Sequence, residues 1–392
     1  MAGWGIAIAW LLAVAQAHGG VPAAAGAAGG AQSATAALRA RVNEVALERL
    51  GPKEAIVEYT GAASGGEFRL LKSGAPIRSG RLTPLAPFSE WGAGKRYFRA
   101  DFSALTAAGR YELEATLGQE RVRSAAFEVG DQAVLVTTAA KLLDYFHASR
   151  WTSAADRHIR IYDTDRFVDV WGGWKDAGGD TGKYLSHLSF ANFFNPQQSG
   201  MVVWALGKSY DTVPQLYARL GLTERVLEET FWGADYLHRV LDPQGYFYET
   251  VFDRWGEPGA ERMVTGFEGL SGVYSAHYRA AYREGGGLAI AALARASIVS
   301  AHSGAHGEFT GPQYLADAER AFAHLETNNT KYCANGVENI IDDYTALLAA
   351  TELYRATGRQ QYLQAARRRA QHVSDRLSPQ GWFVSDGGTR PY

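Results

Sequence analysis

Two carboxylates lie in a glycine-rich stretch that also carries several aromatic residues. The stretch 169–184 reads DVWGGWKDAGGDTGKY, with Asp176 and Asp180 separated by Ala-Gly-Gly. Glycine permits turns in which backbone and acid groups come close to a ligand. Three nearby rings offer flat apolar faces of the kind that stack on sugar rings: Trp171, Trp174 and Tyr184. Acids beside aromatic rings therefore indicate a carbohydrate site.

Other interpretations of the two acids stay open on the residues alone. Asp next to Gly is common in structural turns, where the side chain bonds its own backbone. A calcium loop is a weaker alternative, because the stretch contains no Asp-x-[Asp/Asn]-x-[Asp/Asn]-Gly pattern that ends in Glu. The chain also has no His-Glu-x-x-His pair of the zinc-binding type. The sequence therefore predicts no metal and no cofactor.

The acidic stretch and its continuation through Leu185–Phe190 and Asn195–Gln198 resemble glycoside hydrolase family 9. Most cellulases of that family carry a compact Asp-Ala-Gly-Asp, whereas this chain has one more residue between the acids. The longer spacing resembles the branch that contains exo-β-D-glucosaminidases and bacterial endoglucanase-like proteins. The resemblance extends from about residue 40 to the end of the chain.

The resemblance implies an inverting glycoside hydrolase that acts on β-1,4-linked glycans. Asp180 matches the family's general base, and Asp176 matches the partner acid that helps to hold the attacking water. Inverting enzymes place the base and the proton donor about 6.5–9.5 Å apart to admit that water, so a separate acid is needed. The family supplies this acid as a Glu near its C-terminus, which the resemblance places beyond Tyr392. We therefore expect a C-terminally incomplete copy of such an enzyme.

Three residues that flank the acids are expected to bond or stack a sugar. They are Trp174, Tyr184 and His187. Core packing is an equally weighted alternative for each of them.

A second group of candidate site residues lies near the start of a predicted helix. The resemblance favours a substrate-binding role for Asp343 and Tyr344. The alternative for Asp342 and Asp343 is the ordinary placement of acids near a helix N-terminus, where the helix dipole favours negative charge. The glucosaminidase branch would need an acidic subsite for the 2-ammonium group, and Asp342 or Asp343 is expected to supply it.

Apolar residues recur at spacings of three and four in the C-terminal two thirds of the chain, which predicts helices. The clearest helix is 337–357, with Gly358 as its stop. The resemblance implies a twelve-helix (α/α)6 barrel over 130–392, so the following eight helices predict an incomplete barrel: 131–149, 199–209, 214–220, 223–241, 286–301, 312–327, 337–357 and 360–377.

Short alternating segments separated by turn residues precede the helices. Seven of them in about 90 residues predict a β-sandwich. Residues 98–111 resemble the immunoglobulin-like domain that precedes many family 9 catalytic domains, which implies a structural role for residues 39–129. A carbohydrate-binding role is the minor alternative. The expected strands are 41–47, 55–59, 67–72, 77–82, 96–101, 110–117 and 121–129.

The N-terminus has the composition of an export signal. Residues 1–17 hold an apolar run followed by Ala-Gln-Ala, although a basic n-region is missing. The run is too short to span a bilayer as a helix, so a secreted or periplasmic protein is expected rather than a membrane anchor. Residues 18–38 are rich in Ala, Gly and Ser and are expected to form a disordered linker.

Composition argues against nucleic-acid and membrane partners and excludes stabilisation by an internal disulfide bond. The net charge of −2 gives no reason to expect a nucleic acid or an anionic membrane as a partner. Cys333 is the single cysteine, so no internal disulfide is possible, and a buried or idle thiol is expected. An oligosaccharide or polysaccharide is the expected partner.

These observations predict a glycosidase of the cellulase or exo-β-D-glucosaminidase type. The alternative function is a non-catalytic carbohydrate-binding protein or an inactive fragment of such an enzyme. The aromatics and carboxylates would then hold sugar without a proton donor.

Overall fold

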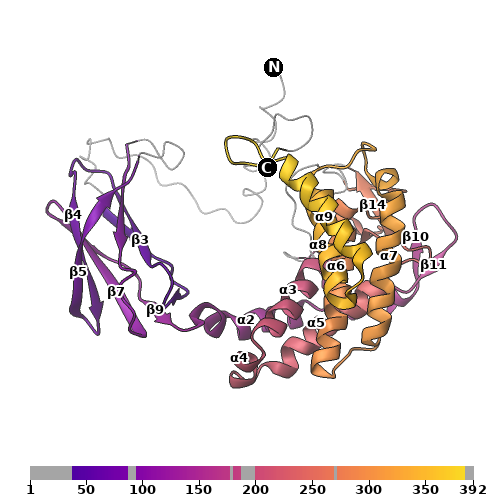
Figure 1. Ribbon diagram of the computed structural model, residues 1–392, viewed down its shortest axis with the longest axis horizontal. Helices are drawn as coiled ribbons and strands as arrows, with labels where there is room; N and C mark the ends of the chain where they lie inside the picture. The colour runs from indigo at the N-terminus through magenta and orange to yellow at the C-terminus, as the bar shows by residue number, and fades with distance from the viewer. Residues whose placement is uncertain (1–37, 87–93, 177–179, 187–198, 269–271, 385–392) are drawn as a thin grey trace, which may run out of the picture. The chain divides into compact units, whose positions relative to one another are not determined.

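The computed structural model describes residues 38–86, 94–176, 180–186, 199–268 and 272–384. The chain divides after Ala133 into two compact units (Figure 1). The expected signal segment 1–17, most of the expected linker 18–38 and the candidate residue His187 lie outside the described residues.

The N-terminal unit is a β-rich domain (Figure 1). β3 pairs with β6 so that Val57 lies opposite Phe98, and β4 pairs with β7 so that Leu70 lies opposite Leu113. All four side chains are buried in the core of this unit, which explains the period-two alternation in the sequence. Its strands are β1 (Leu38–Arg41), β2 (Leu47–Glu48), β3 (Glu54–Tyr59), β4 (Gly66–Lys72), β5 (Ala75–Pro84), β6 (Arg96–Asp101), β7 (Gly109–Leu117), β8 (Glu120–Arg123) and β9 (Phe127–Gly130).

Two of the seven predicted strands differ from the structure. The strand predicted at 41–47 is instead a turn between β1 and β2, in which the Asn43 side chain accepts a hydrogen bond from the Val45 N–H at 2.9 Å. The strand predicted at 121–129 is interrupted between β8 and β9. The interruption is held by Ser124, whose N–H and hydroxyl oxygen exchange hydrogen bonds with the backbone of Leu113.

All eight predicted helices are present in the C-terminal unit. α8 begins where the Asn339 side chain accepts the Ile341 N–H at 2.8 Å, and it ends at Gly358, whose φ of +69° suits glycine. The helices are α2 (Ala133–Ser149), α3 (Ser199–Thr212), α4 (Pro214–Arg219), α5 (Thr223–Arg239), α6 (Gly287–Ser303), α7 (Gly311–Tyr332), α8 (Ile340–Thr357) and α9 (Gln360–Asp375).

α6 is the central helix of the C-terminal unit. It is rich in alanine and buried on nearly all sides, and it packs against α3, α7 and α8 (Figure 1). A helix that is apolar all round belongs in a core. No helix among the described residues has the length and apolar character needed to cross a membrane.

A small sheet of short strands beside the helices carries the acidic stretch. Its strand order is β11-β10-β14-β13-β12, with β15 paired to β14. β12 is the edge strand, and Lys183 and Tyr184 lie opposite Val251 and Thr250 of β13. The sequence did not predict this sheet, because its strands are too short for a period-two pattern to show. The strands are β10 (Ile159–Ile161), β11 (Phe167–Val168), β12 (Lys183–Tyr184), β13 (Thr250–Phe252), β14 (Met263–Glu268) and β15 (Val273–Ser275).

Candidate active site

The two acids of the motif precede β12, and the described residues 176 and 180–184 that carry them are called the acidic loop. The loop is closed by a hydrogen bond from the Asp176 N–H to the Gly182 carbonyl at 3.1 Å. Asp180 Oδ1 accepts the Gly182 N–H at 2.7 Å, and Oδ2 accepts the Tyr184 hydroxyl at 2.7 Å. Both acids are half-buried. Asp180 is thus a fixed carboxylate that keeps part of its surface open.

Tyr184 holds Asp180 and does not offer a ring to a ligand. Its side chain is only 1% exposed and lies against Phe252 in the small sheet. Burial and the neighbouring Asp180 raise the pKa of the phenol well above its usual value. The phenol therefore stays protonated and donates its hydrogen to the carboxylate. The expected sugar-bonding role of Tyr184 is replaced by a supporting one.

Trp174 is also a packing residue, contrary to the expectation that it stacks on a sugar. Its side chain is 7% exposed and lies in the main core of the C-terminal unit, 5.7 Å from the ring of Phe146. The indole N–H donates to Glu229 at 3.2 Å. A Cβ at Gly233 would come within 2.3 Å of the indole, so α5 packs directly on this ring. Trp174 of the motif therefore serves close packing against α5.

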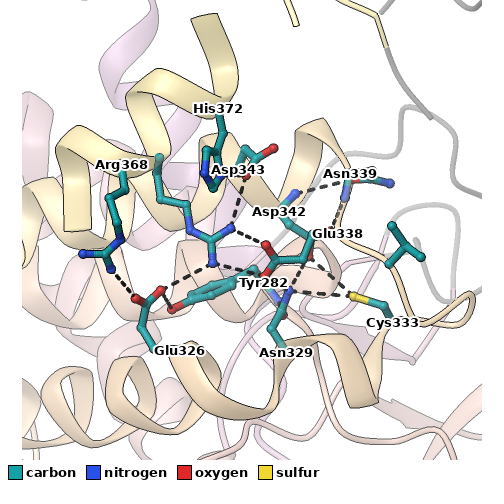
Figure 2. A network of polar contacts seen from close by, with 12 residues as sticks. Tyr282, Glu326, Asn329, Cys333, Glu338, Asn339, Asp342, Asp343, Arg368 and His372 are labelled. Atoms are coloured by element: carbon teal, nitrogen blue, oxygen red, sulfur yellow. Dashed lines mark hydrogen bonds and ion pairs between the residues drawn. The ribbon is translucent and has the colours of Figure 1, made fainter. Parts of the chain in front are cut away.

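Asp343 joins α8 to α9 and does not lie in an open cleft (Figure 2). It is 1% exposed, and its two oxygens bind Arg369, His372 and Arg376 at 3.2, 3.1 and 2.8 Å. Tyr344 is half-buried against Ile341. The sequence led us to expect a substrate-binding role for Asp343, but its carboxylate is already paired with Arg369 and Arg376.

The Asp342 carboxylate is likewise already bound by neighbouring side chains and backbone. Its Oδ2 accepts the Arg283 Nε–H at 2.7 Å. Asp342 also accepts the Asn339 N–H at 2.9 Å through Oδ2 and the Asn329 side chain at 3.0 Å through Oδ1 (Figure 2). The carboxylate is fully buried. Neither acid that was expected to bind an ammonium group is therefore available to one.

A cavity of about 240 Å³ contains functional candidates that the motif did not reveal. Both of its carboxyl side chains are almost fully buried, with Glu249 at 1% and Glu284 at 4% exposure. The wall also includes Cys333, whose thiol pKa is raised mainly by burial, so this thiol is neutral. The other polar residues that line the cavity are His277, Arg279, Lys331 and Tyr332.

Leu185, which follows the acidic loop, contacts the backbone beside two cavity residues. The Leu185 N–H donates to the Glu249 carbonyl at 2.9 Å, directly after the residue that holds Asp180. On the other side Leu185 touches Gly285, where a Cβ would come within 2.5 Å of the leucine Cβ. Gly285 has a φ of +101° and follows Glu284. Leu185 therefore links the segment that carries Asp180 to Glu249 and to the neighbour of Glu284, which line the cavity, while Asp176 and Asp180 are not among the lining residues.

The sequence did not indicate Glu249 and Glu284 as site residues, because their burial beside one cavity depends on residues distant in the sequence. Glu284 precedes three consecutive glycines at the start of α6, and Glu249 follows the aromatic run Tyr246-Phe247-Tyr248. Glycines that permit close backbone approach were the available signal. Only the structure shows that both carboxyl groups enter one cavity.

Glu284 is expected to make the stability of the C-terminal unit depend on pH. Burial raises the pKa of its carboxyl to about 8, the charge of Asp342 adds to the rise, and the Ala281 N–H opposes it. Because the folded state holds the proton more tightly, the stabilisation is complete below the unfolded pKa and is lost as pH rises towards 8. Glu284→Gln should remove this component, which has a slope of up to about 1.4 kcal/mol per pH unit.

Urea unfolding at pH 5, 6, 7 and 8 measures that slope. The exposed Glu44→Gln in the N-terminal unit is the matched control and should leave the slope of the wild type unchanged. Equal slopes for Glu284→Gln and the wild type would contradict the assignment.

Two histidines, His302 and His306, have the i, i+4 spacing of some metal sites, but the structure separates them. Gly304 ends α6 with a φ of +73° between them. His302 Nδ1 lies 2.6 Å from Asp211, whereas His306 Nδ1 lies 2.8 Å from the Gly307 carbonyl oxygen. The described residues contain no cluster of three or more His, Cys, Asp or Glu side chains arranged around a common point.

Comparison with known families assigns both parts of the chain. Residues 137–387 match the family model for glycosyl hydrolase family 9. The chain belongs to glycosyl hydrolase family 9. Residues 35–120 match the cellulase N-terminal Ig-like domain, which confirms the expected immunoglobulin-like fold. The helices that follow are those of the family's (α/α)6 barrel fold.

Solved family 9 structures share this fold at low sequence identity. The Bacteroides ovatus GH9 structure is 20% identical with a TM-score of 0.59, and the match covers 84% of this chain and 64% of that one. The GH family 9 endoglucanase J30 is 23% identical with a TM-score of 0.60, and the match covers 84% and 63%. The chain thus spans less than two thirds of either family 9 structure. No curated protein matches it.

Proposed function

We propose that this family 9 chain belongs to an enzyme that hydrolyses β-1,4-linked glucans with inversion. The observation that carries the proposal is the Asp180 carboxylate, which two donors hold at 2.7 Å. Membership of the family and the likeness to an endoglucanase support the substrate class. Glu249 and Glu284 give the adjoining cavity hydrogen-bonding groups for sugar hydroxyls.

The proposed reaction is a single displacement at the anomeric carbon. Asp180 takes a proton from a water molecule that Asp176 helps to hold, and the water oxygen attacks the anomeric carbon. The glycosidic C–O bond breaks, and a carboxylic acid gives its proton to the departing oxygen. We expect that acid to be a Glu, as the family resemblance implies.

A pair of substrates separates the contribution of the base from that of the acid. A 2,4-dinitrophenyl β-cellobioside has a leaving group that needs no proton, whereas cellotetraose does need one. We expect the 392-residue chain to hydrolyse the activated substrate, and a longer chain to hydrolyse both. Failure of a folded chain to cleave the activated substrate would reject the proposed base.

The alternative function, a non-catalytic glycan binder, predicts a different result. It requires calorimetric binding of cellotetraose without turnover of either substrate by any length of chain. Product anomers analysed by NMR provide a further test, because only inversion releases the α-anomer first from a β-linked glycan.

Glucosamine oligosaccharides are the second substrate class to test, because of the long spacing between Asp176 and Asp180. Arg283, Arg369 and Arg376 neutralise the acids first expected to bind the ammonium group. Glu249 and Glu284 are the remaining buried carboxyl groups at the site. Cleavage of cello-oligosaccharides with no cleavage of glucosamine oligosaccharides would settle the class as glucan.

Tyr184→Phe tests the support of the base. The change removes the hydroxyl that donates to Asp180 and keeps the buried ring. A hydrogen bond to a charged group contributes about 1.5–3 kcal/mol, so kcat on the activated substrate should fall roughly 10- to 100-fold. Tyr217→Phe, which loses a hydroxyl contact to Ser209 on α3, is the matched control and should keep the wild-type kcat.

A further inference from the structure

A buried cluster of four charges lies beneath the acidic loop. Lys183 and Asp156 are completely buried, and Lys183 Nζ lies 2.7 Å from Asp156 Oδ2. The side chains of Arg262 and Asp253 are 14% and 15% exposed and form a second ion pair at 3.1 Å. Arg262 also joins the two pairs through Asp156. Two positive and two negative groups therefore balance within one network.

Lys183 anchors the start of the motif, around Val170 and Gly172. Its ammonium group donates to the carbonyls of Val170 and Gly172, the latter at 3.0 Å, as well as to Asp156. Burial lowers the pKa of Lys183 to about 7 against the attraction of Asp156. Three acceptors around Nζ match the three N–H donors of a protonated amine, so the charged form satisfies the site.

Arg262 anchors the later part of the motif, at Thr181. Its guanidinium binds both oxygens of Asp156, at 2.8 and 3.1 Å, and donates to the Thr181 carbonyl at 2.9 Å. The Thr181 hydroxyl donates in turn to Asp253. The guanidinium also lies over the ring of Trp151, with its carbon 5.0 Å from the centroid. A planar fork with several fixed donors makes this arrangement specific to arginine.

The anchored residues are the two neighbours of Gly182. Gly182 donates its N–H to Asp180 and accepts from the Asp176 N–H through its carbonyl. The position of the Gly182 backbone therefore affects the positions of both Asp180 and Asp176. Thr181 on one side and Lys183 on the other are each tied to the buried charges.

We propose that Arg262 and the Thr181 hydroxyl are positioning residues that set the catalytic geometry of Asp180 and Asp176. The proposal rests on the proposed function for its kinetic consequence, but the positioning itself is a property of the loop. A misplacement of about 1 Å at a reacting group lowers the rate about 100-fold, so small shifts of this loop should affect turnover.

Thr181→Val with Thr181→Ser tests the hydroxyl. Valine keeps the shape of the side chain and removes the donor to Asp253, whereas serine keeps the donor. We expect Thr181→Val to lower kcat on the activated substrate about tenfold with little change in KM. Thr181→Ser should retain at least half of the wild-type kcat. A role in stability alone would lower the melting temperature and leave the kcat of the folded protein unchanged.

Arg262→Lys tests whether the planar guanidinium group of Arg262 is needed. Lysine keeps the charge but replaces the planar fork by one nitrogen, which cannot reproduce the separate contacts of Nε, Nη1 and Nη2 to Asp156 and the Thr181 carbonyl. We expect a larger fall in kcat than for Thr181→Val. Arg160→Lys is the matched control, because Arg160 forms a similar two-point ion pair, at 2.9 and 2.7 Å, with Glu261, the residue before Arg262. This control should keep the wild-type kcat.

Hydrogen exchange followed by mass spectrometry reads the positioning without any turnover. Peptides that cover 180–186 should exchange at least tenfold faster in Thr181→Val and Arg262→Lys, while peptides that cover 159–168 should be unchanged. Wild-type exchange at 180–186 in both variants would overturn the proposal. A wild-type chain without turnover, but with this pattern of exchange, would reject the proposed function and keep the positioning role.

Discussion

Asp180→Asn should lower kcat on the activated cellobioside by about 10²–10⁴, the usual contribution of a general base. Asparagine can still accept the Gly182 N–H through its amide oxygen, which replaces Asp180 Oδ1. Its amide nitrogen faces the Tyr184 hydroxyl, which can turn to accept. The loop should therefore keep its shape while losing the group that takes the proton from water.

Initial rates and circular dichroism together test this result. Asp165→Asn is the control, because Asp165 is an exposed acid in the turn between β10 and β11. It should have the rate of the wild type. If Asp180→Asn retains more than a tenth of the wild-type kcat, the base is another residue, and the first to test is Asp176.

Arg283→Met should destabilise the C-terminal unit by about 3–5 kcal/mol. The change leaves Asp342 fully buried and removes the cation that now lies 2.7 Å from its Oδ2. Burial raises the pKa of this carboxyl, in keeping with the cost of an uncompensated charge at a buried position. Urea unfolding followed by circular dichroism at 222 nm measures the loss.

A double substitution separates the charge effect from lost packing. Arg283→Met with Asp342→Leu removes both charges and should recover much of the stability, since apolar replacement of a buried pair is often neutral. Arg368→Met is the surface control: its side chain is 58% exposed and pairs with Glu326 on α7 (Figure 2). It should change the stability by less than about 1 kcal/mol. Equal losses in the single and double variants would contradict the charge explanation.

The same argument explains why the α8 acids were predicted as ligand groups and found as structural ones. Adjacent acids near a helix start look the same in the sequence whether they face solvent or a neighbouring helix. Arg369 lies 26 positions after Asp343, and Arg283 lies 59 positions before Asp342. No local pattern connects such partners, so only packing shows that the charges are already matched.

The sequence alone determined the secondary structure that depends on local physics. Period-two alternation and turn residues placed most strands of the N-terminal unit, and spacings of three and four placed all eight helices, with Gly358 as the stop of α8. The motif from Asp169 to Tyr184 also predicted an acidic loop, because glycine and aspartate have strong local preferences.

The tertiary structure alone decided which groups meet at that loop. It buried Trp174 in the core, turned Tyr184 into a donor for Asp180, and brought Glu249 and Glu284 into one cavity. The physical reason is that burial, hydrogen bonding and charge compensation depend on neighbours in space. Asp156 and Arg262, which are 106 positions apart, anchor the loop through contacts that no sequence period records.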